Sequence, residues 1–148
     1  MTEIKAMLDE VIDPVVNEIL SIFDVDRAPV PVELMLQRPR EGTWPQVDIA
    51  EMSVSFLNLH DRYAPRMSAV RLLARNIARC EWGQERGLKV LFEDFEYINV
   101  FARALIMPRQ LLDGVDEDDF DRMTLGGRFE MPEEDTVSRL TDLGYELE

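Results

Sequence analysis

The sequence predicts a mostly helical α+β fold with a small sheet, in a single domain that spans residues 1–148. Four stretches carry apolar residues at the spacing of one helical face, and one shorter stretch alternates apolar and polar residues in part, as strands do. The length of 148 residues, with 46% hydrophobic and 31% charged residues, is typical of one globular domain. We expect residues 1–65 to contribute an N-terminal helix with a strand and loop region, and residues 66–145 a helical core.

The first predicted helix spans about residues 2–23. Its apolar stripe consists of Ile4, Met7, Leu8, Val11, Ile12, Val15, Ile19, Leu20, Ile22 and Phe23. Asp13-Pro14 interrupts it, so either the helix kinks there or Asp13 caps a second helix with Pro14 at its first position. Residues 24–31 contain two prolines and three charges and are expected to form a connection.

The following region is the least regular part of the sequence. Residues 32–37 suit either a short strand or one or two helical turns, and residues 38–46, which contain two prolines and a glycine, suit a loop. Residues 47–50 and 52–59 alternate in part. At least one strand is predicted there.

Two strongly periodic helices come next. One is predicted from about Arg66 to Trp82, with Gly83 as its stop. Its buried stripe consists of Met67, Val70, Leu73, Ala74, Ile77 and Ala78. The other is predicted over about residues 90–105, and one of its faces consists of Val90, Leu91, Phe95, Ile98, Phe101, Ala102 and Leu105. Met107-Pro108 breaks the second pattern, although Pro108 can begin a short helix through Leu112.

The last part of the chain begins with the acidic residues 113–121. Their carboxylates precede Phe120, Met123 and Leu125, in the place where acids favour the start of a helix. Gly126-Gly127 is expected to be a break. Residues 132–143 predict a closing helix, which Gly144 ends.

The charge of the chain narrows the classes of partner. Thirty acidic residues against 16 basic ones give a net charge of −14, which repels nucleic acid and anionic membrane surfaces. We therefore expect neither direct nucleic-acid binding nor membrane binding. The charge serves solubility, or it favours a basic protein partner. With no apolar run of roughly 20 residues and no signal-peptide pattern, the sequence predicts a cytoplasmic protein.

Three stretches in the second half together resemble the ImmA/IrrE family of zinc peptidases. The strongest is Phe101-Ala102-Arg103-Ala104-Leu105-Ile106-Met107-Pro108, which is similar to the family's phenylalanine, alanine pair and Leu-Leu-Met-Pro run. Phe129-Glu130-Met131-Pro132 and Arg139-Leu140-Thr141-Asp142-Leu143-Gly144 follow at suitable spacing, and Asn99 also matches a common family asparagine. The resemblance covers roughly residues 66–145 and implies a zincin-like scaffold with a small sheet.

The catalytic motif of that family is absent. Its helix carries His-Glu-x-x-His, in which two histidines on one face hold zinc and the glutamate activates a water. The corresponding positions here are Arg75-Asn76-Ile77-Ala78-Arg79. A guanidinium stays protonated and offers no lone pair to a metal, and asparagine cannot take a proton from a metal-bound water. We therefore expect no metal, no cofactor and no catalytic residue at these positions.

The third ligand of the family is an acid, and the alignment puts Tyr97 in its place, with Glu96 one residue away. One hypothesis is that Arg75 and Arg79 replace the metal by bridging to acids such as Glu96 or Glu93. The alternative is that both arginines point to solvent. The sequence does not decide between the two.

Other candidate chemistry is weaker. His60 is the only histidine, and a pairing with the single cysteine, Cys80, has no support in the surrounding residues, so Cys80 is expected to be a small buried hydrophobe. The run 113–119 lacks the spacing of a calcium-binding EF-hand loop and suits a solvated loop. Trp44 and Trp82 are expected to be packing residues.

The resemblance also implies a role, because active family members act on helix-turn-helix repressors. A member without zinc can keep the docking surface and lose the cleavage. The leading hypothesis is a catalytically inactive regulator that binds a protein, possibly a helix-turn-helix transcriptional repressor in a phage, a mobile element or a stress response. Two alternatives stay open: an active hydrolase or metallopeptidase with a relocated site of carboxylates and His60, and a structural or assembly protein of a phage or mobile element.

Overall fold

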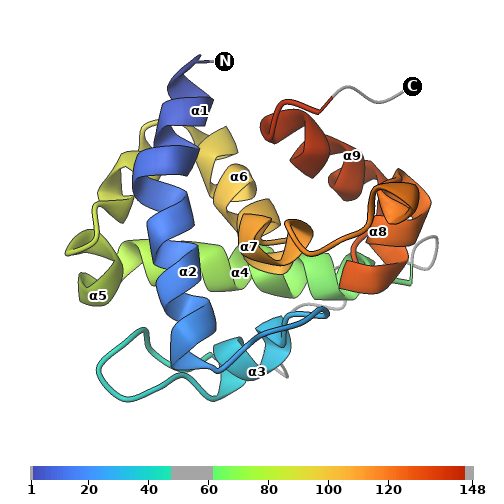
Figure 1. Ribbon diagram of the computed structural model, residues 1–148. Helices are drawn as coiled ribbons and strands as arrows, with labels where there is room; N and C mark the ends of the chain where they lie inside the picture. The colour runs from blue at the N-terminus through green and yellow to red at the C-terminus, as the bar shows by residue number, and fades with distance from the viewer. Residues whose placement is uncertain (1, 48–61, 146–148) are drawn as a thin grey trace.

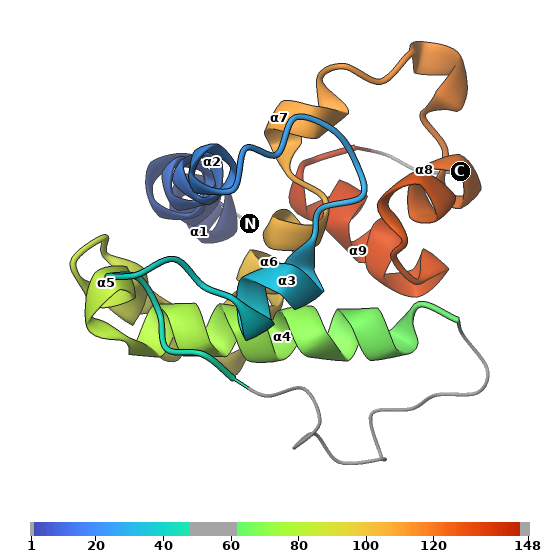
Figure 2. The ribbon, with the colours of Figure 1, turned by 90° about the horizontal axis from the view of Figure 1, so that it is seen from below.

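A computed structural model describes residues 2–47 and 62–145, and these form helices joined by turns and loops (Figures 1 and 2). The prediction of a mostly helical protein is confirmed. The described residues contain no strand. The strands predicted within 47–50 and 52–59 fall on residues 48–61, apart from Val47, and so lie outside the described part of the chain.

The N-terminal helix changes its winding where the sequence predicts an interruption. It consists of α1 (Thr2–Met7), a π-helical segment η1 (Leu8–Ile12) and α2 (Asp13–Ile22). Pro14 has no N–H, and its ring would clash with the carbonyl group four residues earlier, so the wider π turn relieves a conflict that an α turn would contain. Asp13 has helical backbone angles and does not cap α2, so the capping alternative is wrong.

Residues 32–37 form a helix, which decides between the two alternatives that the sequence left open. This helix, α3 (Val32–Gln37), buries Val32, Met35 and Leu36. The loop after it is held by Trp44, whose indole Nε1 donates a hydrogen bond to the Met35 carbonyl oxygen at 2.9 Å. Trp44 is buried, and its ring lies edge-on to that of Trp82 with 5.3 Å between the centroids, so both tryptophans are packing residues as predicted.

The long helix α4 (Ala64–Arg79) ends earlier than the sequence suggests. Cys80 is extended, and a short helix α5 (Glu81–Gln84) follows. Gly83 is therefore not a helix stop: it lies inside α5, where a Cβ atom would overlap the Ile77 carbonyl oxygen. The glycine allows α5 to fold back closely against the end of α4.

The second periodic stretch divides into two elements. A 3-10 helix, η4 (Leu88–Phe92), precedes α6 (Phe95–Ile106), and the Asp94 carboxylate caps α6 by accepting a hydrogen bond from the Glu96 amide at 2.9 Å. Because η4 buries Leu88 and Leu91 three residues apart, it imitates the spacing of an α-helical face. The prediction of a helix from residue 90 was wrong at its start, and so was the predicted burial of Phe95, which is 81% exposed.

The C-terminal third forms three more helices, α7 (Arg109–Leu112), α8 (Arg122–Phe129) and α9 (Glu133–Asp142), with a 3-10 turn η5 (Glu117–Asp119) before α8. Asp121 caps α8 by accepting from the amides of Met123 and Thr124, as the acidic stretch predicts. The predicted break at Gly126-Gly127 is wrong, since both glycines lie within α8. Gly144 ends α9 in the left-handed conformation, with φ of +88°.

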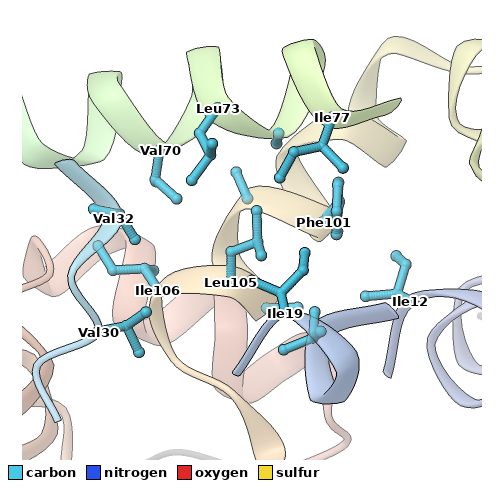
Figure 3. Close-up of a cluster of buried hydrophobic side chains, with 14 of the residues drawn as sticks. Ile12, Ile19, Val30, Val32, Val70, Leu73, Ile77, Phe101, Leu105 and Ile106 are labelled. Atoms are coloured by element: carbon cyan, nitrogen blue, oxygen red, sulfur yellow. The ribbon is translucent and has the colours of Figure 1, made fainter. Parts of the chain in front are cut away.

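Helix α6 is the centre of the core, because it packs against α4, α9 and α2. Figure 3 shows Val70, Leu73 and Ile77 of α4 pointing toward Phe101 and Leu105 of α6, with Ile12 and Ile19 of the N-terminal helix closing the cluster. Apolar residues from Met7 to Leu140 form one connected buried cluster. Within the described residues, no helix is long and apolar enough to cross a membrane.

Candidate functional site

The two arginines that the resemblance aligns with the zinc ligands of the peptidase family lie on the surface of α4. Arg75 and Arg79 are four residues apart, so they share one helix face, and both are exposed. Neither makes an ion pair with any residue in the described ranges, so the bridges to Glu93 or Glu96 are not formed there. Both arginines point to solvent, which was the second of the two alternatives.

Asn76, which the resemblance aligns with the family's catalytic glutamate, has a structural partner. Its side chain is buried, unlike those of the arginines, and its amide Nδ2 donates a hydrogen bond of 2.7 Å to the Pro45 carbonyl oxygen. Pro45 follows the buried Trp44, so this hydrogen bond fastens the loop after α3 onto α4. A buried donor that is already paired with a main-chain acceptor is not available to hold or activate a water.

Tyr97, which the resemblance aligns with the family's third ligand, lies on α6. It lines a groove of about 410 Å³ between α1–η1 on one side and η4–α6 on the other. Met7, Val11 and Val90 give this groove apolar surface, and Glu3, Glu10 and Glu93 are its charged residues. We call it the α1–α6 groove. Partial burial, followed by the negative charges of Glu3, Asp94 and Glu93, raises the pKa of the Tyr97 phenol.

Two aromatic side chains are exposed in the short segment around the start of α6, which also contains the groove residue Glu93. Phe92 is 48% exposed and Phe95 is 81% exposed, although both are large apolar residues. Glu93 and Asp94 lie between them, and Glu96 follows, so the segment reads Phe-Glu-Asp-Phe-Glu. All three carboxylates are exposed. The sequence pattern assigned Phe95 to the core, so periodicity alone missed this surface.

The other candidates from the sequence do not form a reactive group in the described residues. Cys80 is half-buried against the core, and its thiol Sγ lies 3.1 Å from the Ile77 carbonyl oxygen, whereas His60 falls outside the described ranges. The acidic run forms the surface turn η5, where Asp119 pairs with Arg128 at 3.1 Å. Within residues 2–47 and 62–145, no three His, Cys, Asp or Glu side chains are grouped so as to hold a metal ion.

A buried cation at the C-terminal end is a feature that the sequence did not reveal. Arg139 is fully buried on α9, and its Nε donates to the Met107 carbonyl oxygen at 2.9 Å, whereas neither Nη atom has a hydrogen-bond partner among the residues that the structure describes. Burial lowers the pKa of Arg139 to about 10, and the nearby carboxylates of Asp13 and Asp142 oppose that shift. Both acids are already engaged, Asp13 by Arg109 at 2.9 Å and Asp142 by Arg103 at 2.8 Å.

Comparison with known proteins adds no relative. No family model, no curated protein and no solved structure matches this chain. The candidate site is therefore judged from its own residues.

Proposed function

We propose that this protein is a catalytically inactive relative of the ImmA/IrrE peptidases and acts as a regulator by binding a protein partner. The hydrogen bond from Asn76 to the Pro45 carbonyl carries the proposal, because it assigns the general-base position a role in fixing a loop. The exposed guanidinium groups of Arg75 and Arg79 support it, since they offer no lone pair to zinc.

Contact between the stretches that resemble the family supports the proposed relationship. The Arg139 side chain, from the Arg-Leu stretch, donates to the carbonyl oxygen of Met107 in the Leu-Ile-Met-Pro stretch. Arg66 on α4 donates hydrogen bonds to the Phe129 and Glu130 carbonyl oxygens, at 3.4 Å and 3.1 Å, in the stretch 129–132. Segments that are far apart in the sequence thus form one assembly around α4 and α6.

The proposed partner is a helix-turn-helix repressor of transcription, in a phage, a mobile element or a stress response. Such a protein presents a basic face to DNA, and the net charge of −14 on this chain complements that face. Binding there would compete with DNA for the same surface. It would release the repressor from its operator without breaking a peptide bond.

The test is purification of the full chain from its native cell at low salt, with intact-mass spectrometry of co-purifying proteins and zinc analysis of the same sample. We expect an uncleaved helix-turn-helix protein in stoichiometric amount and no stoichiometric zinc. Raising the NaCl concentration should release the partner, because the attraction between exposed charges is screened.

Two outcomes would overturn the proposal. Bound zinc or a cleaved partner would favour the relocated-site hydrolase, and activity lost on chelation would then identify it. A chain that captures no partner and associates with itself in sedimentation would favour an assembly protein that keeps only the scaffold.

A further inference from the structure

We infer that the α1–α6 groove, together with the exposed Phe92 and Phe95 close to Glu93 in the chain, is a docking surface for a basic amphipathic segment of a partner protein. The inference rests on the proposed function in one respect, that the chain acts by binding a protein. It adds where the partner binds and what chemistry its binding segment has.

The apolar part of the surface includes two large side chains that are exposed close together in the chain. Two phenylalanines separated only by Glu93 and Asp94 are both largely exposed. Single exposed apolar side chains are ordinary, but these two rings lie within two residues of Glu93, which lines an open groove with Met7, Val11 and Val90 in its walls. Aromatic side chains that are exposed in the free protein are typical anchors of protein interfaces.

The charged part of the surface has one sign. Glu3 and Glu10 come from the N-terminal helix and Glu93 from the opposite wall, while Asp94 and Glu96 extend the negative charge to the aromatic pair. Among the described residues, no lysine or arginine lines the groove. The raised pKa of the Tyr97 phenol is consistent with this arrangement, because negative charges nearby oppose its ionisation.

The combination selects one class of occupant. A second copy of this chain would bring the same carboxylates against their equivalents, and nucleic acid or an anionic membrane would bring further negative charge. A segment with Lys and Arg flanking a row of apolar residues complements both parts of the surface. Its apolar residues would enter the groove and contact the phenylalanines, and its cations would face the carboxylates.

The test uses three labelled synthetic peptides of about 18 residues, a length that forms several helical turns. The first places Leu at the i, i+3 and i+4 positions of one face and Lys elsewhere. The second replaces each Leu with Ser, and the third replaces each Lys with Glu. Fluorescence anisotropy measures their binding to the full chain, and the inference predicts that only the first peptide binds well, because only it carries both the apolar face and the cations.

The variant that tests the surface is the double substitution Phe95→Ser/Glu93→Lys, and its matched control is Met123→Ser/Glu134→Lys. The control removes one exposed apolar residue and reverses one exposed charge on α8 and α9, away from the groove. We expect the groove variant to weaken binding of the first peptide at least about tenfold and the control to change it by less than about twofold. Backbone amide NMR shifts caused by the peptide should concentrate in residues 3–11 and 90–97.

Several outcomes would overturn the inference. Equal weakening by both double variants would show that net charge alone drives binding, and amide shifts centred elsewhere would move the surface. Equal binding of the second peptide would remove the role of the apolar groove. A dimer in sedimentation that the groove variant abolishes would identify a second copy as the occupant.

The proposed function and this inference can fail separately. If the repressor purified with the full chain binds the groove variant as tightly as the wild type, the regulator stands and this surface is wrong. If the groove binds the basic peptide as described but no partner is captured from the cell, the surface stands and the assignment as a repressor-binding regulator fails.

Discussion

At the residue scale, neighbouring positions on α4 differ in what they contribute. Asn76 is buried and hydrogen-bonded, whereas Arg75 on the adjacent position is exposed and unpaired within the described residues. A substitution that removes a buried donor leaves the Pro45 carbonyl without its partner. A substitution that shortens an exposed arginine removes few contacts and should change the stability little.

We expect Asn76→Asp to lower the free energy of unfolding by about 2–4 kcal/mol, because it puts a carboxylate against the Pro45 carbonyl oxygen. Urea denaturation at neutral pH measures the loss. Burial next to an acceptor would raise the pKa of the new carboxyl group, so the loss should shrink at acidic pH, where the protonated group can donate. The control, Arg75→Ala, should stay within about 0.5 kcal/mol of wild type.

Arg139 is the second residue whose environment leads to a testable prediction, in this case about stability. Its pKa of about 10 lies below the ordinary 12.5, so the folded state holds this proton less tightly than the unfolded state. Burial of the charge therefore opposes folding by about 3 kcal/mol at any pH below about 10, and the penalty declines only as pH rises above that value. The side chain contributes no pH dependence in the neutral range.

Arg139→Met should be as stable as wild type, or up to about 2 kcal/mol more stable, since it removes a buried charge at the loss of one hydrogen bond. Arg103→Met is the matched comparison. It should lower stability, because it leaves the Asp142 carboxylate unpaired at 10% side-chain exposure. Urea denaturation of both variants measures their free energies of unfolding. A free energy of unfolding that falls by more than about 1 kcal/mol in Arg139→Met would mean that the Nη atoms of Arg139 have hydrogen-bond partners in the wild type.

At the element scale, two glycines within helices explain two of the errors in the fold predicted from the sequence, because one is closely packed and the other is open to solvent. Gly83 lies against the Ile77 carbonyl, whereas Gly127 has nothing within 4 Å of its missing Cβ. Both were expected to end helices, because glycine commonly does so. In this chain Gly83 allows close approach of two helices and Gly127 lies inside an ordinary exposed turn of α8, and a local pattern does not distinguish these uses.

Gly83→Ala should lower the free energy of unfolding by about 2–4 kcal/mol, since the new methyl group must push α5 away from α4. Gly127→Ala should instead raise it by up to about 1 kcal/mol, because alanine favours a helix and meets no neighbour there. Thermal and urea denaturation of the pair give the comparison. Equal effects of the two substitutions would contradict the packing described for α5.

Periodicity predicted the helices whose apolar stripes face the core, because burial of one face leaves a repeat in the sequence. It therefore located α2, α4 and α9 well. It did not predict where α6 begins, since η4 repeats its buried residues every three positions. For the candidate site, the sequence predicted that Arg75 and Arg79 bind no zinc, and this stays a prediction. It could not predict the α1–α6 groove, whose walls are about 90 residues apart in the chain.

At the scale of the whole molecule, the cations are mostly used inside the fold. Arg66, Arg103 and Arg109 each join two helices through ion pairs with carboxylates, and Arg86, in the turn after α5, pairs with Glu18 of α2. With 30 acidic residues in the chain, many carboxylates stay without a cation, and their mutual repulsion acts against the compact state.

Raising NaCl from about 20 to 500 mM should therefore raise the melting temperature by several degrees, because screening weakens the repulsion more than it weakens the partly buried ion pairs. Differential scanning fluorimetry measures how the melting temperature changes with NaCl concentration. The variant Glu117→Gln/Asp118→Asn removes two exposed charges from η5, and it should melt higher at low salt and respond less to added salt. A melting temperature that falls with salt would mean that attractive surface pairs dominate.

The widened turn η1 has a consequence for how the chain tolerates insertions and deletions. A π turn contains about one residue more than an α turn, so it rotates α1 by about 100° relative to a helix without it. That rotation turns Glu3 and Met7 toward Glu93 while Val15 and Ile19 keep their places in the core. Deleting Asp9, which does not line the groove, would keep every groove residue in the chain and still turn the Glu3 carboxylate away. The groove therefore depends on the number of residues in this turn as well as on their identity.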